Sequence, residues 1–402
     1  MTNKLRKKWA EIGAILVGRL LQTGMLFLIN LTFMLYADSG LYVDTGVAMA
    51  WASPLAMVAM FGGYMSATQI KTMSSAKDAA YLQGYLIYRP FLFLCFIILC
   101  LCLFVDSNSS FFVFIVTFTT FLALGGISDT FLFYKRTALF ITANVVVSLL
   151  VGLISLLVLY RAENIVVISC VLMSGVLFVG LLLIRSGIAN KTGAQFFMIN
   201  RRFFMGVNIG PSVILLLSSL SLGVFLAIDR LILPYYMAVS ALANYLAAIT
   251  LALPISFLAI IYGKYTLLNN FHSRFSDLTN ARFEITGIAV LVFLGIAILP
   301  IQSQIITQFT VYQFDIVLQI SINMAACLVV LSKQSLAEIY AKKRQIVVSF
   351  INLGLLIAIA PVLIYFASDF QEVGITRLAF NFLYISMIVA ALHAIRTLEW
   401  RD

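Results

Sequence analysis

Residues 225–263 read FLAIDRLILPYYMAVSALANYLAAITLALPISFLAIIYG, which is the end of one long apolar run, a short break and a second apolar run. A helix that crosses a membrane needs about 20 mostly apolar residues, and both runs reach that length. The first run nevertheless contains Asp229 and Arg230, and a charged side chain at the centre of a bilayer costs about 2.5–3.5 kcal/mol. The stretch therefore predicts two successive membrane helices, and its charged pair needs an explanation.

The composition of the whole chain agrees with this local pattern. The 402 residues are 62% hydrophobic and 10% charged, and the mean hydropathy is +1.06. Soluble domains are roughly 45–50% apolar, so the composition predicts an all-α polytopic membrane protein. The net charge of +10 does not indicate nucleic-acid binding, because the basic residues lie in pairs and short clusters between apolar runs.

Apolar runs long enough to cross a membrane occur twelve times along the chain. The predicted spans are 13–36, 45–66, 85–105, 110–133, 139–160, 164–184, 207–231, 238–262, 284–306, 313–333, 346–366 and 374–395. No segment between them is long enough to fold as a separate domain. The helices themselves must therefore carry the function.

The positions of the basic residues predict the orientation of these spans. Lys and Arg are enriched in cytoplasmic loops. With the N-terminus in the cytoplasm, 22 of the 26 Lys and Arg residues lie in cytoplasmic segments. A miscounted span would invert every later loop and remove this bias. The pattern therefore supports twelve spans with both termini in the cytoplasm.

An internal repeat appears when the chain is shifted by 200 residues. Residues 48–63 then align with residues 248–263 at five identical positions, which include Pro54 and Pro254. A shared proline inside a span is a backbone feature, because proline removes one helical hydrogen bond. An offset of six helices predicts two halves of the same orientation, as in several transporter folds.

This repeat predicts two similar six-helix bundles. The N-terminal bundle comprises residues 1–184 and the C-terminal bundle residues 207–402, and residues 185–206 form a cytoplasmic linker between them.

The first and seventh spans are equivalent in the two halves, and each carries one stripe of polar residues. At 100° per residue the stripes cover about 100° and about 40° of the helix circumference. They consist of Glu11, Arg19, Gln22 and Asn30 on the first span, and of Asn208, Ser212, Ser219 and Arg230 on the seventh. Because arginines inside spans usually face a bundle interior or a water-filled cavity, the stripes predict a hydrated cationic passage between the bundles.

Each arginine on these stripes also has a simpler interpretation. Arg19 could extend to the membrane surface or pair with Glu11. Arg230 lies near the outer interface and could pair with Asp229. Adjacent residues on a helix do not face each other, however, which favours Arg230 facing the passage and Asp229 capping its helix or bridging to a neighbouring one.

Two further ionisable residues leave alternatives open. Arg377, near the outer end of the last span, is either an external ion-pair partner of Asp369 and Glu372 or another cation of the passage. Asp129, near the cytoplasmic end of the fourth span, is either a proton-coupling carboxylate or a local partner of the basic residues that follow it.

The remaining polar residues do not indicate catalysis. The chain has two histidines, no phosphate-binding glycine motif and no nucleophile elbow, so we expect no enzymatic activity, no metal and no cofactor. Isolated amides in spans typically form hydrogen bonds between helices. We predict this role for most members of the set Asn144, Gln302, Gln308, Gln319, Asn323, Asn352 and Asn381.

The stretch at 225–263 resembles the Wzx-type polysaccharide (O-antigen repeat unit) flippases of the MOP exporter superfamily. Those proteins often have an Asp-Arg pair followed by aliphatic residues, a short loop, a tyrosine and a long apolar helix. The matching residues are Asp229, Arg230, Leu231, Ile232, Leu233 and Tyr245. Residues 41–70, LYVDTGVAMAWASPLAMVAMFGGYMSATQI, resemble the N-terminal half of the same family. Pro234 and Asn244 depart from it, since relatives commonly carry glycine at both positions.

The resemblance implies a flippase that moves a polyprenyl-pyrophosphate-linked oligosaccharide, as in lipopolysaccharide synthesis, from the cytoplasmic to the periplasmic leaflet of a bacterial inner membrane. It also implies membrane lipid, a polysaccharide polymerase and a chain-length regulator as partners. A cationic passage suits an anionic pyrophosphate. The predicted substrate-binding residues are Arg19, Gln22, Asn30, Asn208, Arg230 and Arg377, and Asp129 and Asp229 are predicted to have coupling or structural roles.

Two other functions are compatible with a polytopic chain. A multidrug or small-solute exporter of related topology would need acidic and aromatic residues for cationic substrates, whereas the polar stripes here carry arginines. A membrane-embedded glycan polymerase would need a large external loop or a catalytic His/Asp set, and neither occurs in the sequence.

Overall fold

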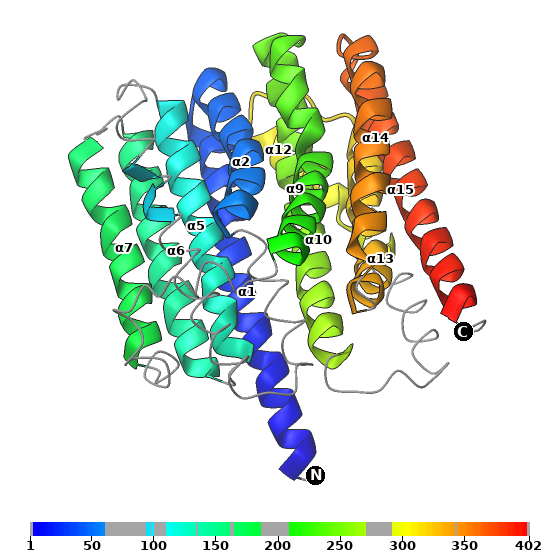
Figure 1. The fold of residues 1–402 in the computed structure, drawn as a ribbon. Coiled ribbons are helices and arrows are strands. Elements are labelled where there is room, and N and C mark those ends of the chain that lie inside the picture. The colour runs from blue at the N-terminus through cyan, green and yellow to red at the C-terminus, as the bar shows by residue number, and fades with distance from the viewer. Residues whose placement is uncertain are drawn as a thin grey trace. The chain divides into compact units, whose positions relative to one another are not determined.

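The computed structural model describes residues 3–60, 94–96, 98–99, 110–133, 136–160, 165–185, 209–270, 292–341 and 344–399. Every element that it places there is a helix. The helices are α1 (Asn3–Tyr36), α2 (Ser39–Met60), α5 (Ser110–Phe133), α6 (Thr137–Leu159), α7 (Ile165–Arg185), α9 (Ile209–Ile232), η2 (Leu233–Tyr235), α10 (Val239–Asn270), α12 (Leu299–Phe309), α13 (Ile316–Ala341), α14 (Gln345–Tyr365) and α15 (Phe370–Glu399). Figure 1 shows them as a set of long helices.

The predicted fold class is confirmed, because every element in the described residues is a helix and many of these helices are long and apolar enough to cross a membrane. Nine helical stretches in the described residues are long and apolar enough to cross a membrane, and two shorter apolar helices are present at Val167–Leu183 and Ile316–Val329. Together these match eleven of the twelve predicted spans. The remaining span, 85–105, lies almost entirely outside the described residues.

Several helices extend beyond the predicted spans. Helix α10 continues to Asn270 instead of ending at residue 262, and α1 begins at Asn3 instead of residue 13. The prediction followed hydropathy, which changes where the chain leaves the bilayer. The helical hydrogen bonds do not end there, because lysine and the polar residues of these segments are compatible with a helix in water.

Large apolar side chains on the surface support the membrane assignment. On α14, Phe350 and Ile357 are 69% and 77% exposed, and a spacing of seven residues places them on one face of the helix. Monomeric soluble proteins rarely expose large contiguous apolar patches, whereas lipid is the natural environment of such a face.

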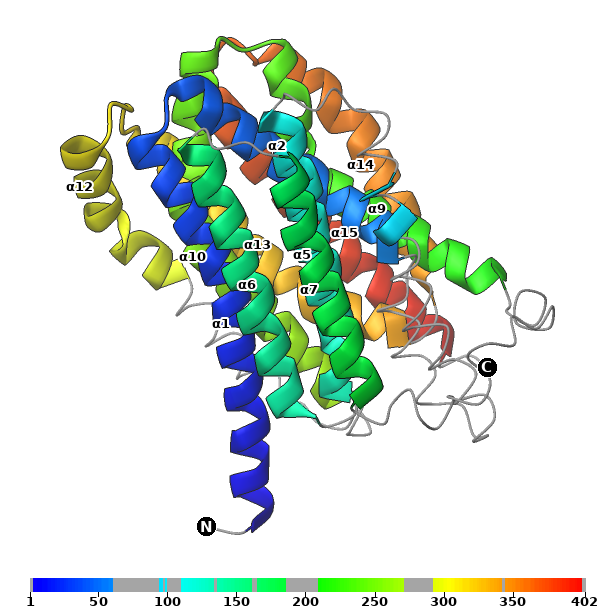
Figure 2. The ribbon, with the colours of Figure 1, turned by 90° about the vertical axis from the view of Figure 1, so that its left-hand side faces the viewer.

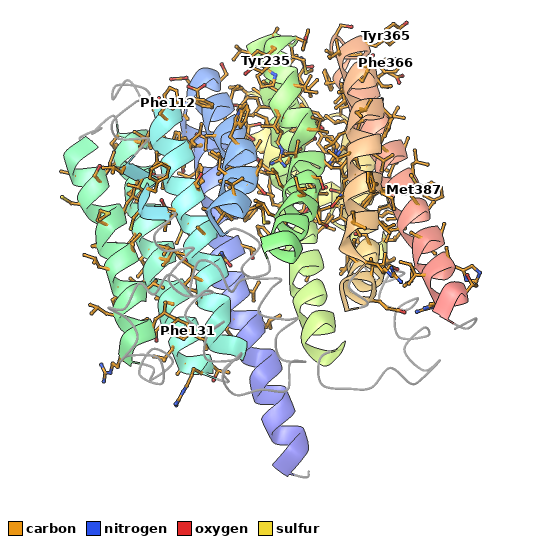
Figure 3. The ribbon with its side chains drawn as sticks, in the orientation of Figure 1. Phe112, Phe131, Tyr235, Tyr365, Phe366 and Met387 are labelled. Carbon is orange, nitrogen blue, oxygen red and sulfur yellow. The ribbon has the colours of Figure 1, made fainter. Side chains whose placement is uncertain are left out.

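Exposed tyrosines mark the helix ends that the charge bias predicts to be external. Tyr36, Tyr235 and Tyr365 are 76%, 75% and 79% exposed, and Tyr160 at the end of α6 is 80% exposed. Tyrosine is enriched where a membrane meets water, because its ring is apolar and its hydroxyl is polar. Figure 3 labels Tyr235, Tyr365 and Phe366 near one end of their helices, and Met387 lies farther along α15.

Contacts between residues divide the chain into two compact units. Unit 1 comprises Met1–Met25 and Ala48–Val224, and unit 2 comprises Leu26–Val47 and Phe225–Asp402. The division falls inside α1, α2 and α9, so each of these helices belongs partly to both units. This division is based on contacts between residues. The predicted bundles, 1–184 and 207–402, are based on the sequence repeat and stay a prediction.

In unit 1, helices α5, α6 and α7 pack against one another, as Figures 1 and 2 both show. The first part of α1 packs on α6, where the Ser148 hydroxyl donates a hydrogen bond to the carbonyl of Leu21 at 3.2 Å. The side-chain amide of Asn144 on α6 donates a buried hydrogen bond to the hydroxyl of Ser128 on α5 at 3.0 Å.

In unit 2, helix α13 is central, because it packs against both α10 and α15. Helix α14 packs mainly against α15. A bidentate ion pair joins α13 to α15, with the Nε and Nη2 atoms of Arg396 2.8 Å and 2.5 Å from the two carboxylate oxygens of Glu338.

The predicted repeat has a counterpart in the helix boundaries. Helices α2 and α10 begin at Ser39 and Val239, which are 200 residues apart, and Pro54 and Pro254 lie inside them at the same offset. Helices α2 and α10 therefore share one backbone plan.

Candidate functional site

The last turn of α9 holds a buried carboxylate. Asp229 is 3% exposed. Its Oδ2 atom accepts a hydrogen bond of 2.5 Å from the hydroxyl of Tyr245, a fully buried residue on α10. Its Oδ1 atom accepts the backbone N–H of Arg230 at 2.9 Å. Asp229 therefore bridges α9 to α10.

Arg230 is only loosely paired with this carboxylate. Its Nε atom lies 3.8 Å from Asp229 Oδ1, near the limit of an ion pair, and its side chain is 22% exposed. That Nε is buried without a hydrogen-bond partner in the described structure, and the Nη2 atom reaches the carbonyl of Leu226 only at 3.4 Å. Because a guanidinium carries five N–H donors, Arg230 retains donors for a ligand.

A second guanidinium approaches the same turn from α15. Arg377 is 5% exposed, and its Nη1 atom donates to the carbonyl of Phe225 at 2.7 Å. Its guanidinium carbon lies 5.1 Å from the centre of the Phe225 ring, a cation–π distance. Asp229 interacts electrostatically with both Arg377 and Arg230. Arg377 thus joins α15 to α9.

The two alternatives for Arg377, an external ion pair with Asp369 and Glu372 or a cation of the passage, both stay predictions. In the described structure its guanidinium bonds to α9, and Asp369 accepts the backbone N–H of Gln371 at 2.9 Å at the start of α15. Arg377 lies seven residues into that helix, about 10 Å from its start. The helix turns the arginine toward α9, where it is buried.

We call Phe225, Asp229, Arg230, Tyr245 and Arg377 the α9 charge cluster. All five belong to unit 2. The cluster contains two guanidinium groups and one carboxylate, so one positive charge has no counter-ion inside it. Buried charge is stable only when it is paired or hydrogen-bonded. Asp229 accepts a hydrogen bond from Tyr245 and interacts electrostatically with both arginines, of which Arg230 is the more exposed.

The other predicted site residues lie apart from this cluster or outside the described residues. Gln22 is buried in unit 1 against α5, at a point where a side chain at Gly125 would meet its amide. Asn30 is buried in unit 2 and donates to the carbonyl of Leu26 at 2.8 Å. The side chains of Arg19 and Asp129 lie outside the described part of the structure, and so does the whole of Asn208.

The prediction for the isolated amides is confirmed in unit 2, where three of them meet. Gln302 donates to the carbonyl of Leu251 at 2.8 Å, and Asn323 donates to Gln302 at 3.0 Å. Gln319 donates to the carbonyl of Ala248 at 3.1 Å. These bonds join α12 and α13 to the part of α10 that precedes Pro254, so the network holds α10 in place.

Equivalent positions of the two repeats also meet in unit 2. A Cβ atom on Gly46 would lie 2.8 Å from Cδ1 of Leu246, its counterpart 200 residues later. Nearby, the hydroxyls of Tyr42 and Thr250 are 2.8 Å apart, and the Tyr42 ring lies 5.4 Å from that of Tyr312. Helices α2 and α10 therefore cross at one pair of equivalent positions, Gly46 and Leu246.

The sequence could not reveal this crossing, although the repeat contained a signal. A glycine at position 46 that aligns with a leucine at position 246 is a small-to-large pair, which suits close packing. Tyr312 lies in the loop after α12, and burial together with the nearby carboxylate of Asp38 raises its pKa.

Comparison with known proteins gives little beyond these contacts. No protein-family model matches the chain, and no curated protein sequence matches it. Among solved structures, a eukaryotic MATE transporter is similar over 98% of this chain and 96% of its own, with 13% identity and a TM-score of 0.49. A likeness at this level does not assign a substrate.

Proposed function

We propose that the chain is a flippase that moves a polyprenyl-pyrophosphate-linked oligosaccharide from the cytoplasmic to the periplasmic leaflet of a bacterial inner membrane. The observation that carries the proposal is the excess positive charge of the α9 charge cluster. Arg230 keeps free donors at the edge of this cluster, in a chain that otherwise has few charges in its helices.

The chemistry of the substrate fits this charge. Pyrophosphate is a polyanion, and guanidinium binds it through two parallel charge-assisted hydrogen bonds. The polyprenyl chain remains in lipid while the head group passes along the protein. No covalent bond changes, so neither a nucleophile nor a cofactor is needed.

The α2–α10 crossing supports a mechanism of alternating access. Helices α2 and α10, which carry a proline at the same offset, meet at one pair of equivalent positions, Gly46 and Leu246. Such a contact can open and close by a small rotation of one hairpin against the other. In this proposal the head group binds Arg230 in one state and is released in the other.

Transport in proteoliposomes tests the proposal. The substrate is a polyprenyl-pyrophosphate-linked oligosaccharide with a fluorescent label, and the measurement is the rate at which the label becomes protected from a quencher outside the vesicles. We expect Arg230→Ala to lower this rate about tenfold or more, as for the loss of a hydrogen bond to a charged group. Arg344→Ala, which changes an exposed arginine outside the spans, is the matched control and should leave the rate unchanged.

The competing function makes a different prediction in the same vesicles. An exporter of cationic drugs needs a carboxylate that can face its substrate, whereas Asp229 is already engaged by Tyr245 and by guanidinium groups. Transport of a cationic dye that depends on Asp229, without movement of the lipid-linked oligosaccharide, would replace the flippase proposal by the exporter.

A further inference from the structure

Asp229 is the nearest competitor for any anion that binds Arg230. The two residues are adjacent in sequence, and the shortest contact between their charged groups is 3.8 Å. A carboxylate turned fully toward a guanidinium would form bonds of about 2.7–2.9 Å and neutralise it. The helix directs these adjacent side chains about 100° apart, and a contact from a neighbouring helix can fix the carboxylate in this orientation, away from Arg230.

The hydroxyl of Tyr245 provides that contact. It lies 2.5 Å from Asp229 Oδ2, the shortest hydrogen bond that Asp229 makes, and it comes from a different helix. The second oxygen is held by the backbone N–H of Arg230 at 2.9 Å. Arg377 supplies positive charge to the same carboxylate from α15. Both oxygens of Asp229 thus accept hydrogen bonds that do not come from the Arg230 side chain.

We propose that Tyr245 is a positioning residue, which holds the Asp229 carboxylate toward α10 and so keeps the Arg230 guanidinium available for the pyrophosphate group of the substrate. This inference rests on the proposed function, and it assigns a role within the same site. Tyr245 does not touch the substrate in this account. It acts through Asp229, and its effect on binding therefore disappears when Asp229 has no charge.

The test compares four variants by their affinity for inorganic pyrophosphate, measured by calorimetry on the purified full chain in detergent. Tyr245→Phe removes only the hydroxyl, and we expect about tenfold weaker binding, because Asp229 can then pair with Arg230. Asp229→Asn should bind at least as tightly as the natural chain. The double variant Tyr245→Phe with Asp229→Asn should bind within about twofold of Asp229→Asn, and Arg230→Ala should lose binding.

A purely structural role for Tyr245 gives a different pattern. Tyr42→Phe is the control for stability, since it removes one hydroxyl from another fully buried tyrosine that bonds between helices. Both tyrosine variants should lower the unfolding temperature to a similar extent. Only the binding defect of Tyr245→Phe should be reversed by Asp229→Asn.

Three outcomes would overturn the inference. These are natural affinity in Tyr245→Phe, equally weak binding in the double variant, and no pyrophosphate binding by the natural chain. Failure of the proposed function is a separate result. If pyrophosphate binds through Arg230 with the expected pattern, but the lipid-linked oligosaccharide does not cross the vesicle membrane, the positioning role stands and the flippase does not.

Discussion

At the scale of single residues, two buried carboxylates in the described part of the chain are each paired with basic groups. Asp229 lies between a phenol and two guanidinium groups. Glu338, which is 6% exposed, binds Arg396 through both carboxylate oxygens. The sequence identified Asp229 and Arg230 as unusual, because charges in apolar runs are rare. It could not identify their partners, since Arg377 lies almost 150 residues away and meets α9 only through the packing of α15.

The ion pair between α13 and α15 gives a prediction about stability. Arg396→Ala should lower the free energy of unfolding by about 1–3 kcal/mol, because Glu338 stays buried without its bidentate partner. The effect should be smaller than for a fully buried pair, since the Arg396 side chain is 52% exposed. Thermal unfolding in detergent measures it. Arg344→Ala should not change the unfolding temperature, and an equal loss in both variants would contradict a specific role of the pair.

At the scale of helices, sequence periodicity and run length predicted most of the structure. Helix α5 occupies residues 110–133 as predicted, because a helix satisfies the backbone groups of a long apolar run within the run itself. Helix ends were predicted less well where polar residues continue a helix beyond the bilayer, as in α10 up to Asn270. The bond from Tyr245 to Asp229 also belongs to this scale. It joins residues that are sixteen apart and lie on either side of the turn between α9 and α10. No local sequence pattern specifies the angle between these two helices.

The crossing of α2 and α10 leads to a prediction about packing. Gly46→Leu should destabilise the protein by about 1–3 kcal/mol, because its Cβ atom alone would lie 2.8 Å from Leu246. Adding Leu246→Gly should recover most of the loss, since the two positions are equivalent in the repeat and the pair keeps its total volume. Unfolding temperatures of the single and the double variants measure this.

A glycine elsewhere serves as the control for that substitution. A Cβ atom on Gly354 of α14 would have no neighbour within 4 Å, so Gly354→Leu should be neutral or slightly stabilising, as expected for a better helix former. No recovery in the Gly46→Leu/Leu246→Gly double variant would show that the two sides of the crossing are not equivalent.

At the scale of the whole molecule, the distribution of basic residues predicts how the chain is oriented. Of the 26 Lys and Arg residues, 22 lie in segments predicted to be cytoplasmic, and exposed tyrosines lie at the opposite ends of the helices. We therefore expect single cysteines at Tyr160, Tyr235 and Tyr365, introduced into a variant without other cysteines, to react with a membrane-impermeant maleimide in intact cells.

The opposite side of the membrane provides the control for this labelling. Cysteines at Arg185 and Arg344, which are exposed residues in predicted cytoplasmic segments, should react only after the cells are permeabilised. Reaction of both groups of sites in intact cells would contradict the orientation. The reversed pattern would place the termini outside.

The assignment of Leu26–Val47 to the same unit as Phe225–Asp402 bears on how the chain is made. The ribosome releases the first helical hairpin long before it synthesises α10, and proteins generally fold from the N-terminus during synthesis. Gly46 and Tyr42 can therefore contact Leu246 and Thr250 only after α10 has been synthesised. Unit 2 can be completed only late in biosynthesis. A C-terminal fragment produced alone would lack the helical segment Leu26–Val47, which packs in the same unit.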